Sequence, residues 1–264
     1  MDKNADYDVI MDAKGIDKYS FSKLSSIYQC PYEYYLYYNK KVPGENNSFA
    51  QVGSLTHEIL EKYMNGKILQ FEMKDLFLDS FDELIPNGVI MQVSDTFSKD
   101  LTQNYKDNCA SYLENFNGFE GYKILGTEQE FNLLMRIKDK TIILNGFIDL
   151  ILQSNDGNFV VVDYKSKGAF KNKAEKKKYA RQLYLYSIYI KYKYGEWPKK
   201  MWFEQFRINH QEIIEWNMED FLETLDWIYD TVDLIEKEEF YVPNRDYFYC
   251  NNLCNYRNIC DMKG

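Results

Sequence analysis

The chain has 264 residues, of which 45% are hydrophobic and 28% are charged, and its formal net charge is −9 at pH 7. A chain of this length and composition can bury one substantial core, as water-soluble globular proteins do. No apolar run approaches the roughly 20 residues that cross a bilayer, and the acidic first twelve residues lack the apolar centre of a signal peptide. We therefore expect a cytoplasmic protein without membrane contact. The richness in Asn, Lys, Tyr and Ile indicates an AT-rich genome, which we expect to be bacterial or phage.

The first half of the chain predicts helices. Apolar residues recur at helical spacing over 19–38, where Ser20 or Ser22 can act as the N-cap. Pro31 lies within this segment and predicts either a kink or two short helices. Further helices are expected over 52–64, 74–84 and 95–116.

The apolar pattern changes period in the middle of the chain. Strands are expected over 122–137, 141–152, 158–165, 201–209 and 212–216, and helices over 174–194 and 218–238. These elements predict an α/β fold in a single domain, with a mixed central sheet flanked by helices. Its expected parts are a helical N-terminal part over 19–120, a core over 121–216 and an irregular, cysteine-rich segment over 240–264.

A hairpin is predicted around Asp156. The loop Asn155-Asp156-Gly157 fits a type I turn that is closed by a glycine in the left-handed region. Centring the hairpin on Asp156 pairs residues whose numbers sum to about 312, which places Asp149 opposite Asp163. Lys165, two residues further on, lies on the same face.

Two carboxylates held that close together require a cation or a shared proton. Oxygen ligands that fill only part of a coordination shell suit Mg²⁺ or Mn²⁺. A solvent-facing acidic pair is the alternative, but the apolar runs 150–152 and 160–162 favour a buried sheet.

These residues also resemble a known family. Gly146-x-Ile148-Asp149 followed by Val162-Asp163-Tyr164-Lys165 resembles the core signature of the PD-(D/E)XK nuclease superfamily. Gln182-Leu183-x-x-Tyr186 resembles the Q-x-x-x-Y motif of its RecB-like branch, and Gly53-x-x-x-His57 resembles the helical histidine motif of that branch. The resemblance extends from about residue 19 to residue 260 and implies a restriction-endonuclease-like core.

The resemblance implies a role for each matched position. Glu128 matches the acidic residue on the strand before Asp149, although Glu130 on the same face is an alternative. Of the two histidines, His57 is expected to be a ligand and His210 to be structural. The expected metal ligands are His57, Glu128, Asp149, Asp163 and the Tyr164 backbone carbonyl, and the expected catalytic residues are Asp149, Asp163, Lys165, Gln182 and Tyr186.

A basic stretch follows Lys165. Such a run of charges is usually a solvated surface, but its position just after the expected active site favours contact with DNA phosphates. The residues expected to bind DNA are Lys167, Lys171, Lys173, Lys176, Lys177, Lys178 and Arg181.

Four of the five cysteines form a further pattern. Cys30 is followed, more than 200 residues later, by Cys250, Cys254 and Cys260. This arrangement resembles the iron–sulfur clasp of RecB-like nucleases of the AddB and CRISPR-adaptation exonuclease type, although three residues rather than two separate Cys250 from Cys254. A 4Fe–4S cluster is expected, with Zn²⁺ or unligated thiols as alternatives, and Cys109 is expected to be a small core residue.

The expected function is hydrolysis of phosphodiester bonds in DNA. The resemblance implies an exonuclease that prefers single-stranded ends, and any helicase or other recombination or replication partner would be a separate chain because no nucleotide-binding G-x-x-x-x-G-K-[ST] motif is present. A catalytically silent DNA-binding or scaffold subunit and a structure-specific endonuclease are the alternatives.

Overall fold

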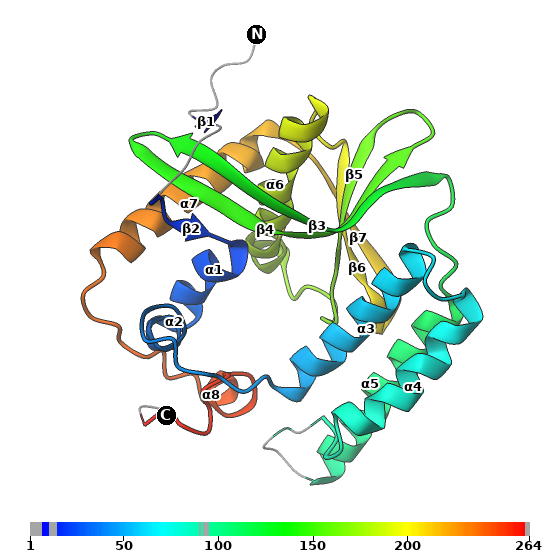
Figure 1. The fold of residues 1–264 in the computed structure, drawn as a ribbon. Helices are drawn as coiled ribbons and strands as arrows, with labels where there is room; N and C mark the ends of the chain where they lie inside the picture. The colour runs from blue at the N-terminus through cyan, green and yellow to red at the C-terminus, as the bar shows by residue number, and fades with distance from the viewer. Residues whose placement is uncertain (1–6, 11–14, 90, 92–94, 262–264) are drawn as a thin grey trace.

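A mixed β-sheet flanked by helices forms the centre of the computed structural model, which describes residues 7–10, 15–89, 91 and 95–261 (Figure 1). The expected α/β architecture is thereby confirmed. Within the described residues the sheet has seven strands, in the order β1-β3-β4-β5-β6-β7, with β2 pairing separately with β4. The strands are β1 Tyr7–Ile10, β2 Lys18–Tyr19, β3 Tyr122–Ile137, β4 Lys140–Ser154, β5 Phe159–Tyr164, β6 Lys200–Gln205 and β7 His210–Glu215.

The β4–β5 hairpin has the predicted register. Leu150 pairs with Val162 and Leu152 pairs with Val160. The turn closes at Gly157, whose φ is 82° and whose N–H donates to the Ser154 carbonyl at 2.9 Å. Because β5 then pairs in parallel with β6, the end of β5 that carries Asp163 lies inside the sheet.

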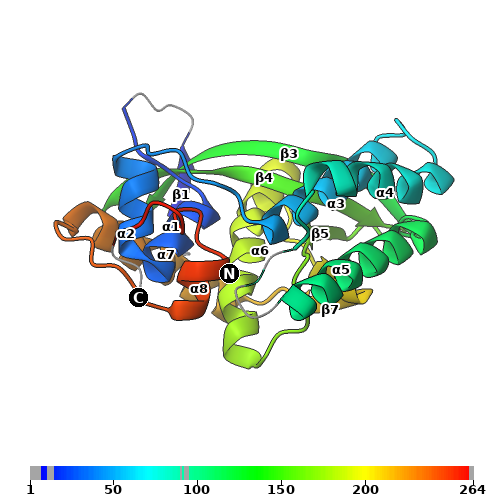
Figure 2. The same cartoon turned by 90° about the horizontal axis from the view of Figure 1, so that it is seen from below.

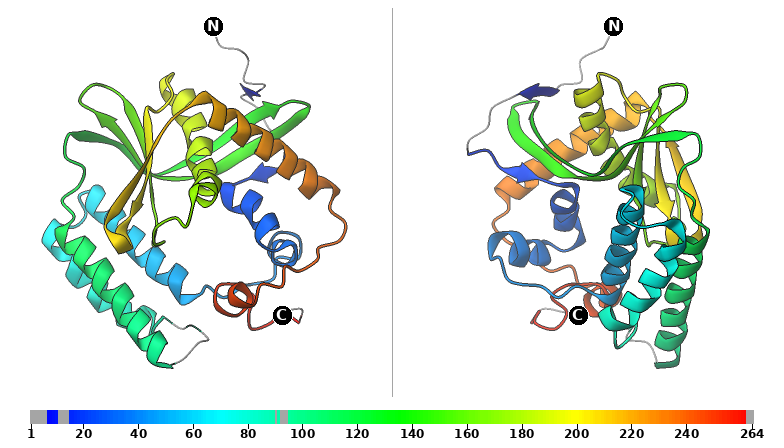
Figure 3. Two further views of the ribbon diagram at one scale, coloured as in Figure 1. Left: turned by 180° about the vertical axis from the view of Figure 1, so that it is seen from behind. Right: turned by 45° about the vertical axis from the view of Figure 1, so that its right-hand side comes forward.

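The sheet is covered on both faces, which explains the continuous apolar runs of β4 and β5. Residues alternate between two cores: Ile151 and Val161 belong to one, and Leu150 and Val162 to the other. The first core is covered by α6 (Lys173–Tyr194) and α7 (Met218–Lys237), and the second by α3 (Ser48–Met64), α4 (Met73–Leu84) and α5 (Asp95–Asn115). Figure 3 shows these two groups of helices on opposite sides of the sheet.

The first predicted helix is interrupted, as Pro31 indicates. Helix α1 (Phe21–Gln29) begins after Ser20, whose hydroxyl accepts a hydrogen bond from the Lys23 N–H at 3.1 Å. It is followed by the short helix α2 (Pro31–Tyr34) and a π-helical turn, η1 (Tyr35–Asn39). Seen from below, α1 and α2 lie with the C-terminal helix α8 (Tyr247–Asn252) on one side of α6, and α3, α4 and α5 lie on the other (Figure 2).

Some elements differ from the expectation. The strand expected over 201–209 ends at Gln205, because Phe206–Ile208 form a 3-10 turn (η3) and Asn209 has a φ of 47°. The segment expected to be irregular contains α8, and the strands β1 and β2 were not predicted. Two short 3-10 turns, η2 (Gln70–Glu72) and η3, complete the described elements. No helix in the described part of the chain is long and apolar enough to span a bilayer.

Candidate active site

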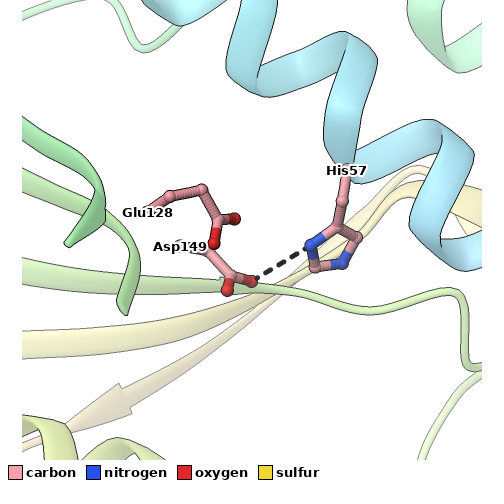
Figure 4. A group of neighbouring side chains, drawn as sticks. All are labelled: His57, Glu128 and Asp149. Atoms are coloured by element: carbon pink, nitrogen blue, oxygen red, sulfur yellow. Dashed lines mark ion pairs between the residues drawn. The ribbon is translucent and has the colours of Figure 1, made fainter. Parts of the chain in front are cut away.

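The site lies between α3 and the sheet. His57 on α3, Glu128 on β3 and Asp149 on β4 each offer one ligand atom, and these atoms lie within 4.8 Å of one another (Figure 4). His57 Nδ1 is 3.6 Å from Asp149 Oδ2. The structure thus brings together three residues that are about 70 and 20 positions apart in the chain, in an arrangement that could hold a metal ion.

The ring of His57 is oriented by the backbone. Its Nε2 lies 3.0 Å from the Tyr164 carbonyl oxygen, so a neutral ring donates its Nε2 proton there and keeps the lone pair of Nδ1 on the side of Asp149. Burial lowers the pKa of His57, which favours that neutral form. The Tyr164 carbonyl, predicted as a ligand itself, is thus the hydrogen-bond acceptor that orients the His57 ring.

Glu128 reaches the site through a strained backbone. It lies between the pairs Thr127–Leu150 and Gln129–Ile148, opposite Asp149, and its φ is 43°. Such a value is uncommon for a residue other than glycine, and residues with strained backbones are concentrated at active sites and ligand-binding sites. Glu130 is exposed, accepts a hydrogen bond from Asn132 and lies outside the group of ligand atoms, so of the two candidates the structure brings Glu128 to the site.

Asp163 begins a chain of polar contacts that leads to α6. Its side chain is almost fully buried, and its Oδ2 lies 2.5 Å from Lys165 Nζ. Lys165 Nζ also donates to Gln182 Oε1 at 2.9 Å, and Gln182 Nε2 donates to the Tyr186 hydroxyl at 2.7 Å. All of the predicted catalytic side chains except Asp149 are therefore joined in one line, and Asp149 is tied to it because its Oδ2 accepts the Tyr164 N–H at 2.7 Å.

The glycines of two motifs lie where the backbone is in close contact with other residues. A Cβ on Gly146 would lie 3.2 Å from the ring of Phe131 and 3.8 Å from that of Tyr186, so glycine leaves room for the Phe131 ring. A Cβ on Gly53 would lie 3.4 Å from Ser166 Oγ. This is an ordinary van der Waals distance; it shows that α3 packs against the segment that follows Lys165, and His57 follows one helical turn later.

Burial controls the acid–base properties of the carboxylates. It raises the pKa of Asp149 to about 6 and that of Asp163 to about 6, against the opposing effect of the Lys165 charge. Burial, with the neighbouring Asp149, Glu61 and Asp163 charges, raises the pKa of Glu128 to about 7. These groups resist ionisation because their negative charges lie close together in a poorly solvated place, which is the condition that a bound cation relieves.

A pH dependence follows for the metal-free protein. The pKa of Glu128 is about 7 in the fold but near 4.5 when solvated, so the fold binds this proton more tightly than the unfolded chain does. The resulting stability is complete below about pH 4.5 and is lost as the pH rises through 7. We expect Mg²⁺ or Mn²⁺ to stabilise the protein more at pH 8 than at pH 5.5, because ligation requires the ionised carboxylates.

Thermal unfolding at both pH values, with EDTA or with metal, measures this effect. Glu128→Gln should reduce the metal-induced stabilisation at pH 8, whereas Glu130→Gln, a matched change two residues away, should preserve it. Equal stabilisation by metal at both pH values, or a larger loss in Glu130→Gln, would contradict the assignment of Glu128.

Sequence reasoning missed two residues that hold the segment after Lys165. Arg207 Nε donates to the Ser166 carbonyl at 2.8 Å, and Gln205 Nε2 donates to the Gly168 carbonyl at 2.7 Å. Gln205 is the last residue of β6, and Arg207 lies in the turn η3 that follows. No motif marks them in the sequence, because their partners are backbone atoms about 40 residues away.

Three of the seven basic residues expected to bind DNA are paired with acids. Lys167 contacts Glu175 at 2.8 Å, Lys176 contacts Glu212, and Lys177 contacts Asp220 at 2.9 Å and Glu223 at 2.5 Å. Arg181 packs on the ring of Trp227, with its guanidinium carbon 4.8 Å from the ring centroid. Lys171, Lys173 and Lys178 are exposed and form no ion pair with any described residue.

This pairing divides the lysines into two sets with different expected effects on DNA binding. Changing Lys171, Lys173 and Lys178 together to Gln should lower the slope of log K against log salt for single-stranded DNA by up to about 2. The triple change of the paired Lys167, Lys176 and Lys177 should lower it less, because their charges are already partly neutralised. Equal slopes for wild type and the first triple variant would show that the basic stretch is a solvated surface that does not contact DNA.

The four expected ligand cysteines line one small cavity. Cys30, Cys250, Cys254 and Cys260 all face it, together with Tyr249 and Tyr256. The Tyr256 N–H lies 3.4 Å from Cys254 Sγ. No three described cysteine sulfurs lie within 4.8 Å of one another, whereas sulfurs around one zinc ion at about 2.3 Å would be about 3.8 Å apart.

The remaining cysteine and histidine behave as expected. Cys109 is fully buried in the α3–α4–α5 core, where burial raises its pKa to about 11. His210 is exposed on β7, and its Nε2 lies 3.5 Å from Glu212. Cys109 contacts Thr56, the residue before His57, and it does not line the cavity of the other four cysteines.

Comparison with known proteins identifies the family of the chain. The family model of the PD-(D/E)XK nuclease superfamily matches residues 18–261, and the chain belongs to this superfamily. Membership indicates a metal-dependent nuclease. No curated protein matches the chain. A solved structure described as the crystal structure of SSO0001 is similar over 96% of this chain and 90% of that one, with 13% identity and a TM-score of 0.39, a likeness too weak to support any functional conclusion.

Proposed function

We propose that this protein is a RecB-like deoxyribonuclease that degrades DNA from single-stranded ends, with Mg²⁺ or Mn²⁺ as the cofactor. The proposal rests on two neighbouring sets of residues. One is the possible metal-binding group of His57, Glu128 and Asp149, and the other is the row of polar contacts from Asp163 through Lys165 to Gln182. DNA is the proposed substrate, and a helicase or a recombination or replication protein is the proposed partner.

The residues present suit a hard divalent cation. Carboxylate oxygens with one imidazole nitrogen are ligands that Mg²⁺ and Mn²⁺ accept. Asp163 Oδ2 is buried and, apart from the Lys165 charge, has no hydrogen-bond partner among the described residues, so it also has capacity for a cation. His57, Glu128, Asp149 and Asp163 would hold the ion, with the Tyr164 carbonyl beside them; the ion would lower the pKa of a water molecule and offset charge on the phosphate.

The protein's own groups supply the remaining chemistry. Lys165 Nζ, fixed between Asp163 and Gln182, presents a cation where charge develops on the scissile phosphate and orients the attacking water. Gln182 keeps Lys165 in place and is itself held by Tyr186. Since Tyr186 is buried against Phe131, its role in this proposal is to position Gln182 at the edge of the substrate strand.

We further propose that the cysteine cavity holds a 4Fe–4S cluster. Four cysteines around one cavity supply the ligand set of such a cluster. Their sulfurs are spread more widely than a single zinc ion requires. The cluster would join α2, which begins after Cys30, to the C-terminal segment.

Linear and circular DNA strands distinguish an exonuclease from an endonuclease. Linear single strands with a labelled end should be degraded to short products in Mg²⁺ or Mn²⁺, while circular single strands of the same sequence should persist. Rapid cutting of the circles would instead identify an endonuclease with the same active site.

A further inference from the structure

A groove rich in aromatic residues lies between α1, the π-helical turn and the beginning of α6. Its volume is about 490 Å³, and rings from four different segments line it: Phe21, Tyr37 and Tyr38, Tyr179, and Tyr249. We refer to it as the tyrosine groove. The active-site residues described above do not line it, so it is a separate feature of the surface.

One side of helix α6 links the tyrosine groove to the active site. Lys178 lines the groove and lies four residues before Gln182, which in turn lies four residues before Tyr186. Residues at this spacing share one side of a helix, about 6 Å apart along its axis. The next groove residue, Tyr179, contacts the Phe203 ring, and Lys165 Nζ lies 5.7 Å from the centroid of that same ring.

The lining of the groove suits an unpaired nucleic-acid strand. Tyr37 is 54% exposed, with its ring held edge-on to Tyr38 at a centroid distance of 4.7 Å, so one base can stack on it. Lys178 is exposed and has no ion-pair partner among the described residues, which leaves its charge for a phosphate. Ser22 and Ser25 also line the groove.

One acid, Glu33, also lines the groove. Both carboxylate oxygens of Glu33 are engaged within the protein: one accepts the Tyr249 hydroxyl at 2.7 Å and the other accepts the Asn255 N–H at 3.3 Å. Glu33 therefore connects the groove wall to the C-terminal segment.

We propose that the tyrosine groove binds the single-stranded part of the DNA substrate next to the active site, with a base stacked on Tyr37 and a phosphate at Lys178. This inference rests on the proposed nuclease function. Single-stranded DNA fits better than duplex because only unpaired bases expose their faces, and stacking on aromatic rings tolerates any sequence.

The test measures DNA binding without cleavage. The full chain carrying Asp149→Asn is titrated into a fluorescent 20-nucleotide single strand and, separately, into the corresponding blunt duplex. Adding Tyr37→Ala should weaken binding of the single strand by about 5- to 100-fold and change duplex binding little. Tyr37→Phe should keep the wild-type affinity, and Tyr192→Ala, an exposed tyrosine at the other end of α6, is the matched control.

Lys178 gives an independent readout. Lys178→Gln should lower the salt slope for the single strand by about 0.7, the value for one lost phosphate contact, whereas Lys199→Gln should not. Suppose that the wild type cleaves DNA but that Tyr37→Ala leaves the affinity unchanged and Lys178→Gln leaves the slope unchanged. This result would disprove DNA binding in the tyrosine groove and would not affect the proposed nuclease function. Equal weakening on single strand and duplex by Tyr37→Ala would also disprove binding in the groove, and a wild type that neither binds nor cleaves DNA would overturn both proposals.

Discussion

Replacing Lys165 by Ala is expected to slow DNA cleavage by about 10²- to 10³-fold, the usual effect of removing one charge-stabilising group. Lys165 Nζ is held 2.5 Å from Asp163 Oδ2 and 2.9 Å from Gln182 Oε1. It therefore contributes a fixed cation whose position requires no rearrangement during the reaction. Because Lys165 is not a ligand, the variant should still bind Mn²⁺, as isothermal titration can show.

The carboxylates should behave differently. Asp149→Ala and Asp163→Ala remove proposed ligands, so cleavage and metal binding are expected to be lost together while the protein remains folded. Lys199→Gln serves as a control for the loss of one positive charge on the surface. A purified Asp149→Ala, Asp163→Ala or Lys165→Ala variant that cleaves at the wild-type rate would remove this site from the account.

Replacing Cys30, Cys254 or Cys260 by Ser is expected to abolish the colour of the protein. Anaerobically purified wild type should be brown, with broad absorbance in the visible range from thiolate-to-iron charge transfer. Each variant should lose this absorbance and its iron, since all four cysteines line the same cavity. DNA cleavage should fall as well, because the cavity adjoins the tyrosine groove through Tyr249 and Glu33.

The same variants should unfold at lower temperature. A cluster bound by Cys30 and Cys260 closes a loop of more than 200 residues, and loop closure of this length stabilises a fold by several kcal/mol. Part of the attachment remains without the cluster. The Asn47 side chain donates to the Leu253 carbonyl at 2.7 Å, and the Tyr256 hydroxyl donates to the Val42 carbonyl at 2.8 Å.

Cys109→Ser is the matched control for this experiment. Cys109 is buried in the core formed by α3, α4 and α5 and does not line the cysteine cavity, so the variant should keep its iron and its colour. Zinc in place of iron in anaerobic preparations would rule out the cluster but keep a metal clasp. A Cys30→Ser variant with unchanged metal content and stability would rule out both.

The sequence predicted the centre of the site because local rules govern it. The turn at Gly157 sets the hairpin register, and the strand period then places Asp149, Asp163 and Lys165 relative to one another. Helical spacing likewise predicted that Gln182 and Tyr186 lie together, and they form a hydrogen bond.

Other features depend on contacts between distant segments. The choice of Glu128 over Glu130 follows from a left-handed backbone at Glu128, which strand alternation does not predict. The acids that pair with Lys176 and Lys177 lie on β7 and α7, more than 35 residues away, so the basic stretch looked more available in the sequence than it is. The strand β2 has only two residues and exists through its pairing with β4.

We propose that His57, Glu128, Asp149 and Lys165 form a metal-dependent nuclease site. This proposal is tested most directly by incubating anaerobically purified protein with end-labelled linear single-stranded DNA in Mn²⁺, in Mg²⁺ and in EDTA, beside the Asp149→Asn variant. We expect the wild type to release short labelled products with either metal, and we expect none in EDTA or from the variant. A folded wild type that binds metal and DNA but leaves every linear substrate intact would identify a catalytically silent DNA-binding subunit and contradict the account.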